Sequence, residues 1–98
     1  MSDADIPNVS NNSAAGQFEM RTEAGPALLK YVLRGGVMDL VHTEVPAQLE
    51  GKGFGGALAK AALEHARTER IKVIPSCAFV RAYLKRHPEY ANLVNEPA

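Results

Sequence analysis

The sequence predicts one α/β domain, in which an antiparallel meander of strands is followed by a right-handed strand–helix–strand crossover and a C-terminal helix. Two observations carry this prediction. Short apolar runs separated by tight-turn residues fill residues 17–45, and a long helical pattern at residues 53–69 stands between two strand-like runs. The length of 98 residues suits a single domain. It is too short for a two-half dinucleotide-binding fold.

The meander is expected to begin at Gln17, where apolar Phe18 and Met20 alternate with charged neighbours. A turn at 23–26 leads to a second strand at 27–33, and Arg34-Gly35-Gly36 supplies the positive-φ residues that a tight hairpin needs. The third strand, 37–45, is apolar on both faces, as is typical of a central strand. Its two faces are expected to carry Val37, Val41 and Val45 on one side and Met38 and Leu40 on the other.

The helical half follows after Pro46. A helix is expected at 53–69, because apolar residues and alanines recur there at helical spacing. The short apolar run 71–74 then forms a strand, and a parallel pairing with the strand at 37–45 is the expected topology. Ser76 is the expected N-cap of a second helix at 77–86, which His87-Pro88 ends. One side of this helix is apolar: Phe79, Val80, Tyr83 and Leu84.

Residues 1–16 differ from the rest in composition. They are rich in Asn, Ser, Asp and Ala, and only Ile6 and Val9 offer side chains to bury, so we expect a flexible tail before a domain at 17–98. The acidic first residues do not resemble a secretory signal, and no apolar run approaches the ~18 residues of a membrane helix. The sequence therefore predicts a cytoplasmic protein without membrane attachment.

Charge is balanced overall but unevenly distributed. Residues 1–50 hold three Lys/Arg and seven Asp/Glu, a net of −4, whereas residues 51–98 hold eight and four, a net of +4. This basic excess is too modest for a nucleic-acid footprint, and either a single anionic ligand or a solvated basic face accounts for it. The only cysteine, Cys77, excludes an internal disulfide, and no His, Cys, Asp or Glu spacing indicates a metal.

The loop at residues 48–56 is rich in glycine and enters the N-terminus of the long helix. Unhindered backbone amides and the positive end of the helix dipole favour an anion there, although a plain glycine-rich turn has the same composition. Gly51, Gly53 and Gly56 fit G-x-G-x-x-G, but the next strand ends in Pro75-Ser76 where a dinucleotide site needs an acidic residue. A small nucleotide-binding domain therefore remains as a minor alternative.

A different spacing in the same loop, Gln48-x-x-Gly51-x-Gly53, resembles the acetyl-CoA loop of the GNAT superfamily of N-acetyltransferases. Further motifs, in the same order, are similar to those of a family of very short single-domain GNAT proteins over residues ~17–94. These motifs are His42-Thr43-Glu44-Val45-Pro46, Ile74-Pro75-Ser76-Cys77 and Pro88-Glu89-Tyr90. The resemblance implies a compact short GNAT fold that binds acetyl-CoA as cosubstrate.

The resemblance also implies where the cosubstrate lies. The strands at 37–45 and 71–74 would splay apart around its pantetheine arm, the main chain near Val45 would pair with that arm, and loop amides would bind the pyrophosphate. The cofactor-binding residues so implied are Val45, Gln48, Gly51, Lys52, Gly53, Phe54, Gly55 and Gly56. A nearby Arg or Lys would take the adenosine 3′-phosphate.

Three residues are candidates for catalysis. His42 is expected near the carboxyl end of one parallel strand and could act as a base, and Cys77 is expected just past the end of the neighbouring strand. The helix dipole favours a thiolate at Cys77, and the resemblance marks this residue as the active-site thiol. Tyr83 stands where many GNAT enzymes have a tyrosine that protonates the departing CoA thiolate. Structural roles for all three are the alternatives.

The resemblance implies an amine as acceptor. Its identity stays open, because the sequence predicts no counterpart of the two N-terminal helices that shape the acceptor pocket in the superfamily. An open acceptor side suits a protein tail or an exposed lysine, and a monomer or weak dimer is expected. The sequence leaves open whether transfer is direct or passes through an acetyl-cysteine. A non-catalytic CoA-binding or protein-interaction module is the alternative function.

Overall fold

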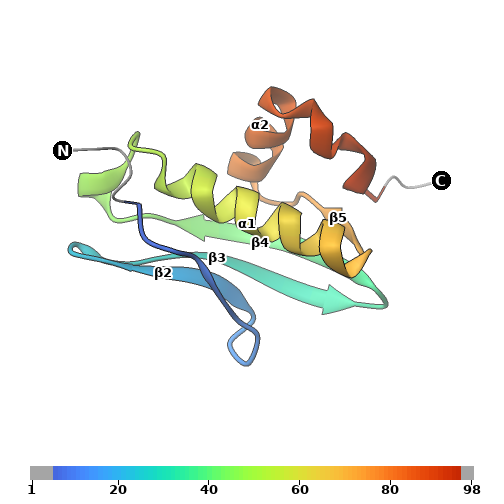
Figure 1. Ribbon diagram of the computed structural model, residues 1–98, viewed down its shortest axis with the longest axis horizontal. Coiled ribbons are helices and arrows are strands. Elements are labelled where there is room, and N and C mark those ends of the chain that lie inside the picture. The colour runs from blue at the N-terminus through green and yellow to red at the C-terminus, as the bar shows by residue number, and fades with distance from the viewer. Residues whose placement is uncertain (1–5, 96–98) are drawn as a thin grey trace.

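Alternating apolar residues along consecutive strands build a sheet with one buried face, on which the helices pack (Figure 1). The computed structural model describes residues 6–95. Its five strands are β1 (Ser10–Asn12), β2 (Gln17–Thr22), β3 (Gly25–Arg34), β4 (Val37–Glu44) and β5 (Lys72–Ile74). They stand in the order β1-β2-β3-β4-β5, with every pair antiparallel except β4 and β5, which are parallel. The predicted meander and the strand–helix–strand crossover are confirmed.

The helices occupy the connections of the second half of the chain. They are α1 (Phe54–Glu69), α2 (Ala78–Arg86) and the 3-10 turns η2 (Ala47–Leu49) and η3 (Pro88–Leu93). In Figure 1, α1 lies across the sheet and α2 is drawn above α1, against which it packs. After η3 the chain returns to the sheet, where Val94 pairs in parallel with Val73 and the Asn95 amide donates to the Val73 carbonyl at 2.8 Å. Within residues 6–95, no helix is long and apolar enough to cross a membrane.

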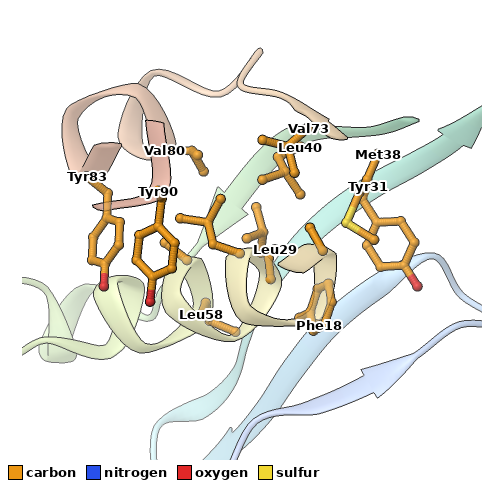
Figure 2. Close-up of a cluster of buried hydrophobic side chains, with 14 of the residues drawn as sticks. Phe18, Leu29, Tyr31, Met38, Leu40, Leu58, Val73, Val80, Tyr83 and Tyr90 are labelled. Atoms are coloured by element: carbon orange, nitrogen blue, oxygen red, sulfur yellow. The ribbon is translucent and has the colours of Figure 1, made fainter. Parts of the chain in front are cut away.

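The hydrophobic core lies between α1, α2, η3 and one face of the sheet (Figure 2). The strands contribute alternate residues and the helices contribute one face each, so the core is continuous from β2 to η3. Its fully buried large side chains are Leu29, Met38, Leu40, Leu58, Leu63, Val73 and Val80. Alanines of α1, among them Ala59, Ala62 and Ala66, let this helix lie close to the strands.

The N-terminal segment is more ordered than its composition predicts. The expectation of a flexible tail over residues 1–16 is wrong for β1, which pairs with β2, and residues 1–5 lie outside the described part. One polar contact to β1 is not evident from the composition of this segment: the Tyr31 hydroxyl donates to Asn11 Oδ1 at 2.6 Å. Ile6 and Val9 also pack against the core. A polar segment can therefore form an edge strand when the strand beside it supplies the apolar surface.

Some predicted boundaries shift. The β2–β3 hairpin turns at residues 23–24, so that Gly25, with φ +114°, already belongs to β3. Ser76 is not the N-cap of the last helix; Cys77 is, in an extended conformation, and Ser76 points instead to Asp39 on β4. The apolar side predicted for this helix is buried only in part, because Phe79 remains 39% exposed.

The largest departure from the prediction is an extra residue in β4. Lys30 of β3 pairs with His42, but the next residue, Tyr31, pairs with Leu40, so Val41 has no partner on β3. Such a bulge reverses which face successive side chains occupy. Val41 is 37% exposed rather than buried in a two-sided central strand.

The contact between β1 and β3 is testable by mutation. Asn11→Ala removes the acceptor of the Tyr31 hydroxyl and should lower the free energy of unfolding by about 1 kcal/mol, which is about 4–8 °C in Tm for a domain of this size. Ser10→Ala, an exposed change on the same strand, is the control and should leave Tm unchanged. If both variants melt like the parent protein, β1 does not contribute to the fold as described.

Candidate functional site

An opening forms where β4 and β5 stop pairing. The parallel register runs from Val37 opposite Lys72 to Asp39 opposite Ile74 and ends there. One further bond joins the two segments, in which the Cys77 amide donates to the Leu40 carbonyl at 2.9 Å. Beyond Leu40 the described residues provide no further strand for that edge of β4. The two parallel strands therefore diverge at their carboxyl ends, where ligands of such sheets bind.

The bulge at Val41 decides which side chain of β4 faces this opening. Thr43 pairs with Leu29, whose side chain is buried in the core, and so it lies on the helix-covered face. Its hydroxyl oxygen is 3.3 Å from the Cys77 sulfur. His42 lies on the opposite face, where it is 55% exposed and its Nε2 is 2.9 Å from Glu44 Oε2. The structure thus brings Thr43 to Cys77 and does not bring His42 there.

A cavity of about 260 Å³ continues the opening. It lies between the end of β4, the turn that follows η2, and the first residues of α1 and α2. Its lining residues are Thr43, Val45, Leu49, Glu50, Gly51, Gly55 and Phe79. The lining is apolar apart from Thr43, Glu50 and the backbone, which suits the end of a slender ligand rather than a bulky one.

Cys77 is the N-cap of α2, and its sulfur lies at the positive end of that helix. Partial burial raises the pKa of the thiol, but the hydrogen bond to the Thr43 hydroxyl and the backbone amides of Val80 and Phe79 outweigh it, so the pKa is lowered overall. A lowered pKa increases the fraction of thiolate, the nucleophilic form, near neutral pH. Position and environment together therefore favour a reactive thiol.

The glycine-rich turn leaves a row of backbone amides free. Gly51 and Gly53 have φ of +80° and +92°, so the chain bends there in a way that favours glycine. Within the described chain, the amides of Gly51 and Gly53 and of the first three residues of α1 have no backbone partner; the helix bonds begin with Ala57 donating to Gly53. A methyl group added at Gly51 would meet nothing within 4 Å, so the turn borders open space at this residue.

The two helix N-termini meet at Gly55. A methyl group built on Gly55 would lie only 2.8 Å from Cζ of Phe79, so the Phe79 ring rests directly on the backbone of α1. The next glycine, Gly56, faces Tyr83 at an ordinary distance of 3.6 Å. The loop glycine at 55 is thus required by side-chain packing against α2, in addition to any role toward a ligand.

Tyr83 lies deeper in the helical layer. Its ring is 7% exposed and stacks on His87 with centroids 4.0 Å apart, next to Tyr90 (Figure 2). Burial, followed by the charges of Glu89 and Glu64, raises the pKa of Tyr83, so the phenol stays protonated at neutral pH. Tyr83 does not line the cavity.

The sequence-derived binding residues divide into two groups. Val45, Gly51 and Gly55 line the cavity. The others do not line it: Gln48 lies in η2, and Lys52, Gly53, Phe54 and Gly56 lie in the turn or at the start of α1. The cavity-lining residues that the sequence analysis did not assign to the site are Thr43, Leu49, Glu50 and Phe79. Phe79 was expected in the core from its helical spacing, and Thr43 depends on the bulge, which no sequence pattern signalled.

Comparisons with known proteins agree with this geometry. The family model of the GCN5-related N-acetyl-transferases matches residues 17–93, from the start of β2 to the end of η3. The chain belongs to the GCN5-related N-acetyltransferase family. The solution structure of a GCN5-like protein from Staphylococcus aureus superimposes with a TM-score of 0.72 at 25% identity, covering 96% of this chain and 93% of that one.

Relatives in vertebrates are similar to parts of the chain. Protein NATD1 of mouse is 40% identical over 52 residues, which are 53% of this chain and 47% of that protein, and the chicken protein matches equally. Protein NATD1 of zebrafish is 34% identical over 79 residues, 76% of this chain and 72% of the relative. The chain spans about half of the length of the mouse and chicken proteins that it matches.

Packing at Gly55 can be tested against its neighbour. Both glycines lie in the first turn of α1, where alanine is favoured over glycine by up to about 1 kcal/mol. Gly56→Ala should therefore raise the free energy of unfolding, whereas Gly55→Ala should not, because its methyl group collides with the Phe79 ring. In a Phe79→Ala background, Gly55→Ala should become stabilising. Equal effects of the two single changes in the parent protein, measured by chemical denaturation, would contradict the contact.

The partner of the thiol can be identified by alkylation. Thr43→Val keeps the side-chain shape but removes the hydroxyl, so the pKa of Cys77 should rise and its reaction with iodoacetamide at pH 7 should slow by about tenfold. The rate at high pH, where every thiol is ionised, should be little changed. His42→Ala is the control and should leave the profile unaltered. A large effect of His42→Ala with none of Thr43→Val would reverse the assignment.

Proposed function

We propose that this chain is an acetyl-CoA-dependent N-acetyltransferase whose acetyl group passes through Cys77 to an amine. The observation that supports this most directly is the junction of three features at one cavity. The Cys77 thiol, whose pKa is lowered, lies 3.3 Å from the hydroxyl of Thr43. Thr43 lines the cavity together with Val45 at the end of β4 and Gly51 of the glycine-rich turn.

The residues present fit the parts of acetyl-CoA in order. The amides of Gly51 and of residues 53–56 are suited to the pyrophosphate, since they have no backbone partner and lie at a helix N-terminus. The free backbone edge of β4 near Val45 is suited to the amide groups of the pantetheine arm. The apolar lining around Leu49 and Phe79 is suited to the end of that arm. Bound there, acetyl-CoA supplies an acetyl group activated as a thioester.

The chain's own groups would then carry the acetyl group. The Cys77 thiolate forms a bond to the acetyl carbonyl carbon, and the carbon–sulfur bond of the thioester breaks, so that CoA leaves as a thiolate and takes a proton. An amine attacks the resulting S-acetyl-cysteine, forms the carbon–nitrogen bond and loses its proton, and Cys77 leaves as a thiolate. The hydroxyl of Thr43 and the amides of Phe79 and Val80 stabilise that thiolate at the start and at the end.

The roles of His42 and Tyr83 follow from where they lie. His42 stands on the helix-free face beside the opening, so we propose that it acts on the incoming amine rather than on Cys77. Tyr83 is protonated at neutral pH and could supply a proton to the departing thiolate only if the ligand reaches beyond the cavity lining. The acceptor is proposed to be an amine on a protein or an exposed lysine.

Ligand binding is the first test. CoA at ~100 times its Kd should stabilise the fold by ~2.7 kcal/mol, more than about 10 °C in Tm, whereas NAD or ATP at the same concentration should not. Gly51→Val and Gly36→Val form a matched pair, because both glycines have φ +80° and open space beside them. Both variants should lose similar stability, but only Gly51→Val should abolish the CoA shift. A shift with NAD and none with CoA would refute the proposal.

Covalent transfer is the second test. Incubation with acetyl-CoA alone should increase the intact mass by one acetyl group, and Cys77→Ser should prevent this while keeping the CoA-induced Tm shift. A candidate amine should remove the adduct from the parent protein and appear as its amide. Full transfer by Cys77→Ser would show direct attack by the amine, and CoA binding without any adduct or turnover would identify a CoA-binding module.

A further inference from the structure

The residue before Cys77 forms a hydrogen bond to an acidic side chain of β4. This residue, Ser76, donates its hydroxyl hydrogen to Asp39 Oδ1 at 2.6 Å. Asp39 lies in β4 just before Leu40, whose carbonyl accepts the Cys77 amide. Its carboxylate is only 15% exposed and its other oxygen is 3.4 Å from the Arg34 guanidinium. None of the residues assigned to acetyl transfer explains why an acidic side chain is held there.

These contacts attach the start of α2 to β4 at three successive points. The Asp39 carboxylate holds the Ser76 hydroxyl, the Leu40 carbonyl holds the Cys77 amide, and the Thr43 hydroxyl lies against the Cys77 sulfur. From the helix side, Arg81 donates to the carbonyls of Pro75 at 2.9 Å and Ser76 at 2.7 Å. The turn at residues 75–77 is therefore fixed from both directions.

We propose that Asp39 is a positioning residue for Cys77: by binding the Ser76 hydroxyl, its carboxylate holds the turn before α2 so that the thiol stays against Thr43 and the helix amides. The proposal rests on the proposed function only in giving Cys77 a chemical role. The neighbours of the thiol lower its pKa only while they stay aligned with the sulfur. A hydrogen bond to the residue before Cys77 limits the movement of the turn and so helps to keep this alignment.

Among the described charged side chains, only Asp39 and Arg81 form hydrogen bonds to the turn at residues 75–77. The elements next to Cys77 carry these charged and titratable side chains: Asp39, His42 and Glu44 of β4, Lys72 of β5, and Arg81, Tyr83, Lys85 and Arg86 of α2. Glu50 lines the cavity next to Thr43. Glu44 and His42 bind each other on the opposite face. Among the described carboxylates, only that of Asp39 accepts a hydrogen bond from the turn.

Alkylation of Cys77 tests the proposal without acetyl-CoA, since the chain has one cysteine and the rate reports on it alone. Ser76→Ala removes the bond and keeps the Asp39 charge. Its rate with iodoacetamide at pH 7 should fall by about two- to tenfold and its pH profile should move to higher pH. Asp39→Asn keeps an acceptor for Ser76 and removes the charge, and its rate should not fall. Arg34→Ala, whose side chain is 71% exposed, should also leave the rate unchanged.

The pattern of the variants decides the outcome. Asp39→Ala should slow alkylation like Ser76→Ala, and the double variant should be no slower than either single one, because both remove the same bond. An unchanged profile in Ser76→Ala, or an equal loss in Asp39→Asn and Asp39→Ala, would overturn the proposal. Because these rates need no acetyl-CoA, failure of acetyl transfer would leave the positioning result intact, and the reverse also holds.

Discussion

The extra residue at Val41 is the constraint on which the site depends. Without it, strict alternation along β4 would place His42 and not Thr43 on the helix-covered face, and the residue facing Cys77 would be a different one. The bulge also follows closely after the last residue of β4 that pairs with β5. The side chains of β4 therefore change faces just beyond the point where the two strands stop pairing. One inserted residue therefore decides which side chain of β4 lies beside the thiol.

The thiol gains its character from backbone as much as from side chains. Burial alone would raise its pKa, and the opposing contributions come from one hydroxyl and from amides of the first turn of α2. A second helix N-terminus lies next to the cavity, where α1 begins with amides that have no backbone partner beside the glycine-rich turn. Phe79, resting on Gly55, joins these two N-termini and keeps them at a fixed separation.

The fold could be predicted from the sequence because its signals are local. Alternation in β2, the glycines of the hairpin and the helical pattern of α1 each act over a few residues, and the family motifs fixed their order. The tail composition misled, because β1 contributes hydrogen bonds and one contact to Tyr31 rather than apolar side chains. The site was predicted less well. Cys77 and the glycine-rich turn have sequence signatures. That Thr43 and not His42 lies beside Cys77 follows from the pairing of β3 with β4, which no local sequence pattern indicates.

The two halves of the sheet differ in how far apart their paired residues are in the chain. Short hairpins join β2, β3 and β4. In contrast, α1 lies between β4 and β5 in the sequence. Val94, near the end of the described chain, covers the edge of β5. Closing long loops is entropically costly and slow, so we expect the meander to assemble first and the β5 half to dock later. Thr43 belongs to the meander, whereas Cys77 belongs to the half that docks later. A partly folded chain would therefore carry an ordinary, weakly nucleophilic cysteine, and activation of the thiol would coincide with completion of the fold.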